Sequence, residues 1–221
     1  MAKHDQVRRG DSAAARVSVV GTGRVERAAD IAHVTFVVEA SRPTAAEARG
    51  VAAATAAAVL EALAAAGVDG ADRRTAGLDV SPTWEHDGSR SIRTGFTVTN
   101  RIAAVVRELE RVGAVLDAGL EAGATGLDGV RFDLADAAAD TTEARRLAVS
   151  DARSRATTIA EAAGCRLGSL VAVAEAGAPV PLPRREARML AMAADASPTP
   201  VIPGSVEVTV SVTAEWELLP G

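Results

Sequence analysis

Two carboxylates and an imidazole stand together in the run Glu85-His86-Asp87-Gly88. These residue types could hold a metal ion or act as a general acid and base. The run lies between two segments in which apolar and polar residues alternate, and Asp-Gly is a strong signal for a hairpin turn. We therefore interpret it as the turn of a β-hairpin.

Three aspartates, Asp133, Asp136 and Asp140, have the spacing of a carboxylate ladder. The surrounding pattern places Asp133 on the polar face of a strand and Asp136 in the connection that follows. Asp140 is expected to begin a helix, where it would form a capping box with Glu143. Carboxylates in such positions have structural roles, so they do not predict catalysis.

The three histidines, His4, His33 and His86, are too scattered along the chain to predict a metal triad. His33 alternates with the apolar face of its segment, so we expect it to face solvent. The single cysteine, Cys165, excludes an internal disulfide. It follows Gly164 at the end of a predicted helix, where the helix dipole does not favour a nucleophilic thiolate. We predict no catalytic residue, no metal site and no cofactor.

The run Gly21-Thr22-Gly23 begins like a dinucleotide-binding fingerprint. The third glycine of that motif is absent, and a second strand is expected where the phosphate-binding helix should begin. We interpret the two glycines as positions that permit a bend or bulge in a strand.

Alternation of apolar and polar residues predicts strands that are buried on one face and exposed to water on the other. Such strands are typical of antiparallel sheets. The clearest is the last, over residues 206–218. The other expected strands cover residues 17–26, 32–40, 76–84, 92–102, 128–135 and 168–174.

Three helices are expected between these strands. The first begins with a capping box of Thr44 and Glu47 and ends at Gly67, and the second covers residues 105–122. Inside the first, residues 51, 55, 59 and 63 recur at every fourth position. The third covers residues 140–164 and carries a ridge of alanines, which predicts close packing on a sheet. These alanines are Ala144, Ala148, Ala152, Ala156 and Ala160.

The order of elements over residues 30–135 is βαββαβ. The chain is therefore expected to have an α+β fold with long antiparallel strands, a βαββαβ-like core and helices packed on one sheet face. We expect a disordered tail over residues 1–15 and a single domain over 16–219. The last strand alone would run about 43 Å, and long strands leave edges with which a second copy can pair. A homo-oligomer is thus predicted.

Residues 177–203 contain six of the nine prolines and form a predicted loop. Inside it, Arg184, Arg185, Met189 and Met192 belong to a short run that could form two to three helical turns. Methionine surfaces adapt to varied partners, and arginines flank this one. We predict partner binding here; a helix packed loosely on its own domain and a disordered linker remain as alternatives.

Composition limits the partners of the 221-residue chain. Its net charge of −5 and its 2% aromatic content argue against nucleic-acid binding, which needs a basic face and stacking side chains. No signal-peptide pattern is recognised at the N-terminus. No window approaches the roughly 20 apolar residues of a membrane span. We therefore expect a cytoplasmic protein without an integral membrane segment.

Several short runs, in this order over residues 16–219, resemble the SIMPL-domain family, long catalogued as a domain of unknown function. The runs are Val17–Val25, Asp30–Ala32, Leu63–Val68, Gly95–Val98, Val115–Gly119, Ala122–Ala124, Val130–Leu134, Ala144–Ala152, Ala160–Gly164 and Ile202–Gly204. The resemblance implies an α+β protein, and some relatives assemble into ring- or channel-like homo-oligomers. Bacterial relatives are often exported to the periplasm or cell envelope and linked to oxidative-stress defence, and a eukaryotic relative is a signalling adaptor. The family has no established catalytic motif, so the resemblance implies no catalytic residue.

These observations together predict a non-enzymatic, self-assembling scaffold with a role in oxidative-stress response. Two alternatives remain. The first is a small-ligand-binding protein or enzyme with a site under the 177–203 loop, in which Arg184 or Arg185 holds an anion. The second is an adaptor that docks a partner through Met189 and Met192.

Overall fold

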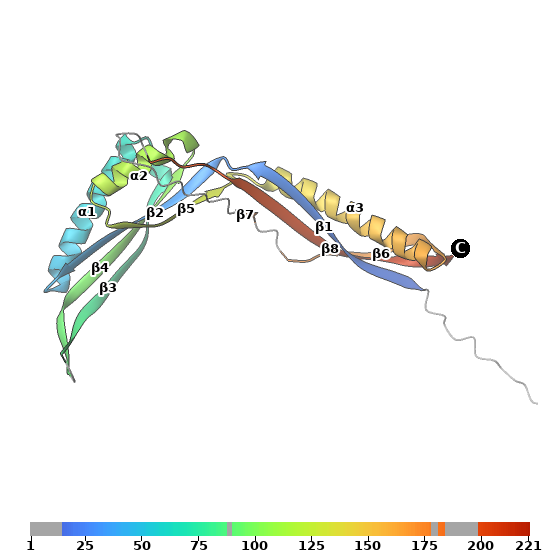
Figure 1. The fold of residues 1–221 in the computed structure, drawn as a ribbon, viewed down its shortest axis with the longest axis horizontal. Coiled ribbons are helices and arrows are strands. Elements are labelled where there is room, and N and C mark those ends of the chain that lie inside the picture. Colours follow the sequence, from blue (N-terminus) through green and yellow to red (C-terminus); the bar gives the residue numbers. More distant parts are fainter. Residues whose placement is uncertain (1–14, 88–89, 178–180, 184–198) are drawn as a thin grey trace, which may run out of the picture. The chain divides into compact units, whose positions relative to one another are not determined.

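The computed structural model describes residues 15–87, 90–177, 181–183 and 199–221 (Figure 1). The chain divides into two compact units. We call residues 26–136 and 181–207 the central unit, and residues 1–25, 137–180 and 208–221 the terminal unit. All of the expected 1–15 tail except residue 15 lies outside the described residues, and so does most of the 177–203 loop.

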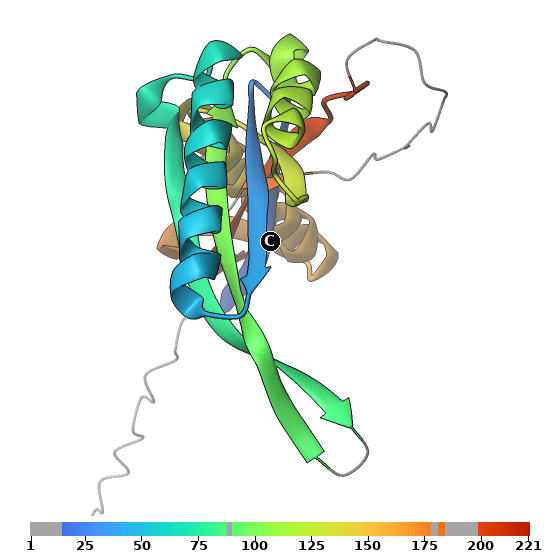
Figure 2. The same cartoon turned by 90° about the vertical axis from the view of Figure 1, so that its left-hand side faces the viewer.

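The central unit has the βαββαβ order expected from the sequence. Its elements are β2 (Ile31–Arg42), α1 (Ala45–Ala65), β3 (Arg73–Asp87), β4 (Arg90–Val106), α2 (Val112–Glu121) and β5 (Gly126–Asp133). The sheet order is β3-β4-β2-β5, and every pair is antiparallel. Figure 2 shows α1 and α2 together over one face of this sheet. The α+β class and the placement of these helices on one face are confirmed.

The core of the central unit lies between β2 and the two helices. Alternate residues of β2 from Ala32 to Ala40 are buried, and Phe36 is completely enclosed. A Cβ atom at Gly119 of α2 would collide with the Phe36 ring. The absence of a side chain at Gly119 therefore allows α2 to lie directly on Phe36.

Helix α1 begins with the expected capping box. The Glu47 amide donates to Thr44 Oγ1 at 3.3 Å, and the Thr44 amide donates to Glu47 Oε2 at 3.3 Å. The helix ends before Gly67, whose φ of 88° is the left-handed conformation that glycine tolerates best. The buried residues are Ala48, Ala52, Ala56, Val59 and Leu63. Of the four residues that recur at every fourth position, 59 and 63 are buried, whereas over its first half the helix turns smaller alanines toward the sheet.

By length and composition, α1 is also apolar enough to cross a membrane, unlike the other helices of the described residues. The sequence had suggested no such segment. The five side chains named above pack α1 against β2 and β4, so within this fold it is a core helix.

Helix α2 begins seven residues later than expected. Strand β4 continues to Val106, and its last residues pair with β2 in the register Val105 to His33 and Val106 to Ala32. A short 3₁₀ turn over Leu109–Arg111 then leads into the helix. Because sheet pairing satisfies the backbone groups of residues 105 and 106, the chain cannot turn into a helix there.

The second sheet has the order β1-β8-β6, with β7 (Pro181–Pro183) also paired to β8. Its long strands are β1 (Arg16–Ala28), β8 (Ser205–Pro220) and β6 (Cys165–Glu175). Residues on alternate positions of β8 from Val206 to Trp216 are buried, as the sequence pattern predicts. Within the terminal unit, α3 (Ala138–Ala162) buries the entire predicted alanine ridge.

Glycines of β1 explain how closely α3 can approach this sheet. A Cβ at Gly21 would collide with the backbone of Ala148 and Ala152, and one at Gly23 with the backbone of Ala144 and Ala148. Gly21 and Gly23 therefore provide space for a helix, a role different from the bend expected from sequence.

The start of α3 also differs from expectation. The helix begins at Ala138, and its N-cap, Ala137, makes no side-chain capping bond. Asp140 is buried inside the first turn, so the capping box expected with Glu143 is wrong. A carboxylate in a first turn is still favoured by the helix dipole, which is why the sequence signal resembled a cap.

Candidate functional site

The four residues predicted to bind a partner, Arg184, Arg185, Met189 and Met192, lie outside the described residues. His4 lies outside them as well. Partner binding by this segment stays a prediction.

Residues 85–87 of the acid–base run belong to strand β3 and pair with β4, while the expected turn at residue 88 lies outside the described residues. Strands β3 and β4 pair as far as Asp87 opposite Arg90, with register shifts between Thr75 and Gly77 and between Thr83 and Trp84. His86 Nε2 lies 3.1 Å from Ser91 Oγ on the neighbouring strand.

Among the described residues, no three His, Cys, Asp or Glu side chains are grouped so that they could hold a metal ion. Asp133 Oδ1 accepts a hydrogen bond from the Leu134 amide at 2.9 Å, while its Oδ2 faces Arg131 at 3.3 Å. Cys165 is half-buried, and its Sγ lies 3.7 Å from the Ala163 carbonyl oxygen. These groups make local structural contacts.

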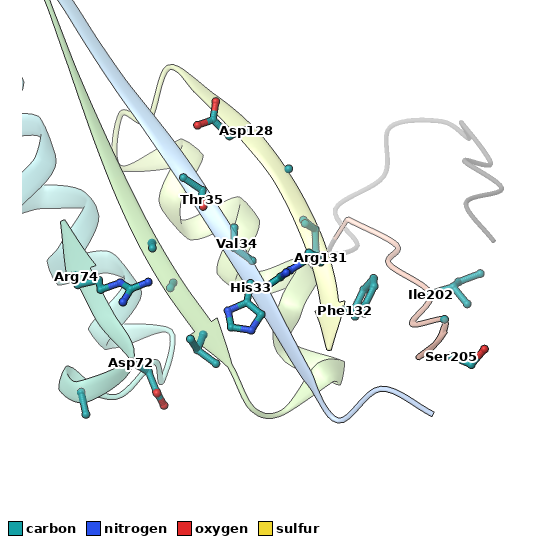
Figure 3. A pocket seen from close by; sticks show the side chains of 17 residues that line it. His33, Val34, Thr35, Asp72, Arg74, Asp128, Arg131, Phe132, Ile202 and Ser205 are labelled. Atoms are coloured by element: carbon teal, nitrogen blue, oxygen red, sulfur yellow. The ribbon is translucent and has the colours of Figure 1, made fainter. Parts of the chain in front are cut away.

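A cleft of about 800 Å³ lies in the central unit (Figure 3). Strands β2, β4 and β5 supply its floor, and residues 71–74 and 202–205 supply its rim. On β2, the lining residues His33 and Thr35 alternate with the buried residues Val34 and Phe36. The floor of the cleft is therefore the sheet face opposite α1 and α2. We call this hollow the sheet cleft.

Strand register places three polar side chains together in the sheet cleft. His33 of β2 lies opposite Arg131 of β5 and, on its other side, opposite Val105 of β4. Arg74 of β3 lies opposite Ala103 of β4, which is two residues from Val105 and therefore on the same face of the sheet. In Figure 3 the side chains of Arg74 and Arg131 extend toward His33 from its two sides.

The two aspartates that line the cleft, Asp72 and Asp128, each have an arginine partner. Asp72 accepts two hydrogen bonds from Arg107, at 2.7 Å and 2.8 Å, and these bonds hold the pKa of Asp72 below its usual value. Asp128 pairs with Arg101 at 2.9 Å. Within the described part of the chain, Arg74 makes no ion pair or side-chain hydrogen bond. Arg74 is therefore the cation of this cleft that is available to a ligand.

The cleft also changes the titration of His33. Partial burial lowers the pKa of His33 below 6.5, and the positive charges of Arg131 and Arg74 lower it further, against an opposing effect of Asp133. His33 lies on the face opposite the core, as expected, but it lines a cleft instead of facing open solvent. Sequence reasoning missed this cleft because its residues come from separate segments whose register no local pattern specifies.

A second feature of the central unit is an exposed apolar strip on β3. Leu78 is 59% exposed, Val80 46% and Trp84 54%, and they occupy alternate positions of one strand. In the sheet order β3 is an edge strand, and α1 packs on β2 and β4. Figures 1 and 2 show β3 and β4 running past the end of α1. We call Leu78, Val80 and Trp84 the β3 strip.

The terminal unit has a comparable edge. Strand β6 ends the order β1-β8-β6, and its Leu170, Val171 and Val173 are exposed. Both sheets thus end in a strand that presents apolar side chains to solvent.

Comparison with known families decides the classification. Residues 17–216 match the family described as SIMPL, a protein of unknown function (DUF541). The chain belongs to the SIMPL family. No enzymatic activity is part of that description.

Named relatives share most of the chain. The 26 kDa periplasmic immunogenic proteins of Brucella abortus (strain S19) and Brucella melitensis biotype 1 are each 30% identical over 212 residues, covering 92% of this chain and 85% of theirs. The uncharacterized protein YggE of Edwardsiella ictaluri is 29% identical over 155 residues, covering 69% of this chain and 64% of its own.

Proposed function

We propose that this SIMPL-family chain is a non-enzymatic protein that self-assembles through the edge strand β3. The observation that carries the proposal is the β3 strip: three large apolar side chains are about half exposed or more on β3, the strand that ends the sheet order in the described part of the chain. An exposed edge with apolar side chains pairs readily with another chain unless it is blocked.

The composition of β3 combines residues that protect an edge strand with exposed apolar side chains. Natural edge strands are usually protected by charged side chains or proline. Here Pro82 lies within the strip, as only an edge strand permits, and Asp79 and Glu85 are interspersed. The side chains of Leu78, Val80 and Trp84 are nevertheless exposed to solvent. Burying apolar surface yields about 25 cal/mol per Å², so a second copy covering the strip would stabilise both chains.

The experiment compares Leu78→Glu/Val80→Glu with the parent chain by size-exclusion chromatography with light scattering. Both residues are exposed, so the variant should fold, while two buried like charges would disrupt an assembly. Leu120→Glu, at an exposed position of α2, is the matched control. We expect loss of assembly in the double variant alone. Equal masses for all three proteins would refute the β3 interface.

The cellular role proposed for this assembly is defence against oxidative stress, on the basis of the family resemblance. It is tested by peroxide survival of the host bacterium without the gene. Rescue by the parent chain and not by Leu78→Glu/Val80→Glu would support a role for the assembly; unchanged survival after deletion would refute the stress role.

The compartment is a separate question. Two relatives are named periplasmic, whereas the sequence pattern predicted a cytoplasmic location. Fractionation of host cells, with a periplasmic and a cytoplasmic marker enzyme followed in parallel, distinguishes the two.

A further inference from the structure

We infer that the sheet cleft binds a small amphipathic carboxylate, of the kind represented by a medium-chain fatty-acid anion. This inference goes beyond self-assembly, because it concerns the helix-free face of the central unit and needs only one chain. The ligand's carboxylate would lie between Arg74 and Arg131 above His33, and its apolar part would lie along Val105 toward Ile202.

Charge is the first observation that supports an anion. Among the lining residues and their ion-pair partners there are four arginines and three aspartates, and each aspartate is paired with an arginine. One positive charge remains, and it belongs to Arg74. Arginine presents a planar fork of donors that suits a carboxylate.

The same balance favours a monoanion over a phosphate ester. One surplus positive charge is neutralised by one carboxylate. A dianionic phosphate would leave negative charge beside the carboxylates of Asp72 and Asp128, both of which line the cleft. The ligand's head group is therefore expected to carry a single charge.

Apolar lining is the second observation. Val105 and Ala103 lie on the floor, and Ile202 lies at the rim. Ile202 is 76% exposed, so a ligand that covered it would remove a large apolar side chain from water. The volume of about 800 Å³ is within the range of small-molecule sites.

His33 gives the site a dependence on pH. The groups that face it are Arg74 from β3 and Arg131 and Asp133 from β5. A carboxylate between the two arginines would offset their effect on His33 and raise its pKa. Binding should therefore be accompanied by proton uptake in mildly acidic solution and should strengthen as the pH falls through the range in which His33 titrates.

The experiment is isothermal titration calorimetry of the full chain with decanoate, kept below its critical micelle concentration. We expect one saturable site per chain. Arg74→Gln should weaken it about tenfold, since a charged hydrogen-bonding partner is lost. Arg49→Gln, at an exposed position of α1, is the matched control and should bind like the parent. Equal affinity in parent and Arg74→Gln would overturn the proposal.

Two further probes separate head group from tail. Decyltrimethylammonium has the same chain length with a positive head, and inorganic phosphate is an anion without a tail. Saturable binding of either as tight as that of decanoate would overturn the ligand class. Ala103→Phe fills the floor without changing charge, and it should weaken decanoate binding while leaving the thermal unfolding temperature close to that of the parent.

Repeating the titration with Leu78→Glu/Val80→Glu separates this inference from the proposed assembly. Decanoate binding that survives in the double variant supports a site within one chain. Loss of binding together with loss of assembly would show that the site needs a second copy, which contradicts the inference.

Discussion

His33 of β2 and Arg131 of β5 lie directly opposite each other in the antiparallel register. Arg131 pairs with Asp133 at 3.3 Å, and Asp133 Oδ2 lies 3.9 Å from His33 Nε2. The imidazole is thus held between a guanidinium and a carboxylate. Partial burial and the guanidinium groups outweigh the carboxylate, so the neutral form of His33 is favoured.

This arrangement predicts how stability depends on pH. In the unfolded chain His33 takes up a proton near pH 6.5, whereas in the folded chain its pKa is lower. The unfolded state therefore binds more protons as the pH falls below 6.5, and the free energy of unfolding should decrease until the folded-state pKa is passed. Urea denaturation across this range measures the effect.

His33→Gln is the control for that dependence. The glutamine does not titrate, so the contribution of His33 to the slope below pH 6.5 should disappear. An identical slope in parent and His33→Gln would mean that His33 is not perturbed by its neighbours.

Gly23 of β1 is expected to be intolerant of any side chain. Gly23→Ala should lower the free energy of unfolding by about 1–3 kcal/mol, because the new methyl group collides with the α3 backbone at Ala144 and Ala148. Gly50→Ala provides the opposite control, because a Cβ at this exposed position of α1 meets no other atom within 4 Å. Its free energy of unfolding should rise by about 0.5–1 kcal/mol, since alanine is favoured over glycine inside a helix. Denaturant titration measures the free energy of unfolding of both variants and of the parent. An unchanged value for Gly23→Ala would contradict the prediction.

The α1 capping box should contribute measurably to stability. Thr44→Ala removes the acceptor of the Glu47 amide and should cost about 1 kcal/mol. Thr44→Ser, which keeps the hydroxyl, should lose much less. Thermal unfolding followed by circular dichroism compares them, and equal losses would show that the hydroxyl is not the stabilising group.

Trp84 reports directly on the β3 strip. In a single chain Trp84 is 54% exposed and Trp216 is buried, so iodide should quench Trp84 selectively. Concentrating the protein should reduce this quenching as Trp84 becomes covered in the assembly. Leu78→Glu/Val80→Glu should show strong quenching at every concentration. Concentration-independent quenching of the parent would contradict burial of the strip.

Local patterns in the sequence predicted most of the fold. The alternation in β8, the alanine ridge of α3 and the Thr44–Glu47 cap each depend on residues that are close in the chain. The start of α2 was predicted wrongly because it depends on pairing of Val105 and Val106 with β2, a distant segment.

The candidate site could be predicted far less well. His33 was correctly placed opposite the core, but its neighbours Arg74 and Arg131 come from two other strands. Their proximity depends on the register of three strands. The role of Gly21 and Gly23 was missed for a similar reason, since it requires a helix more than 100 residues away.

The central proposal, assembly through the open edge of β3, is tested most directly by the solution mass of the parent chain at micromolar concentration. Multi-angle light scattering is expected to give a whole-number multiple, two or more, of the 22.5 kDa chain mass. A single species of 22.5 kDa throughout the concentration range would contradict it.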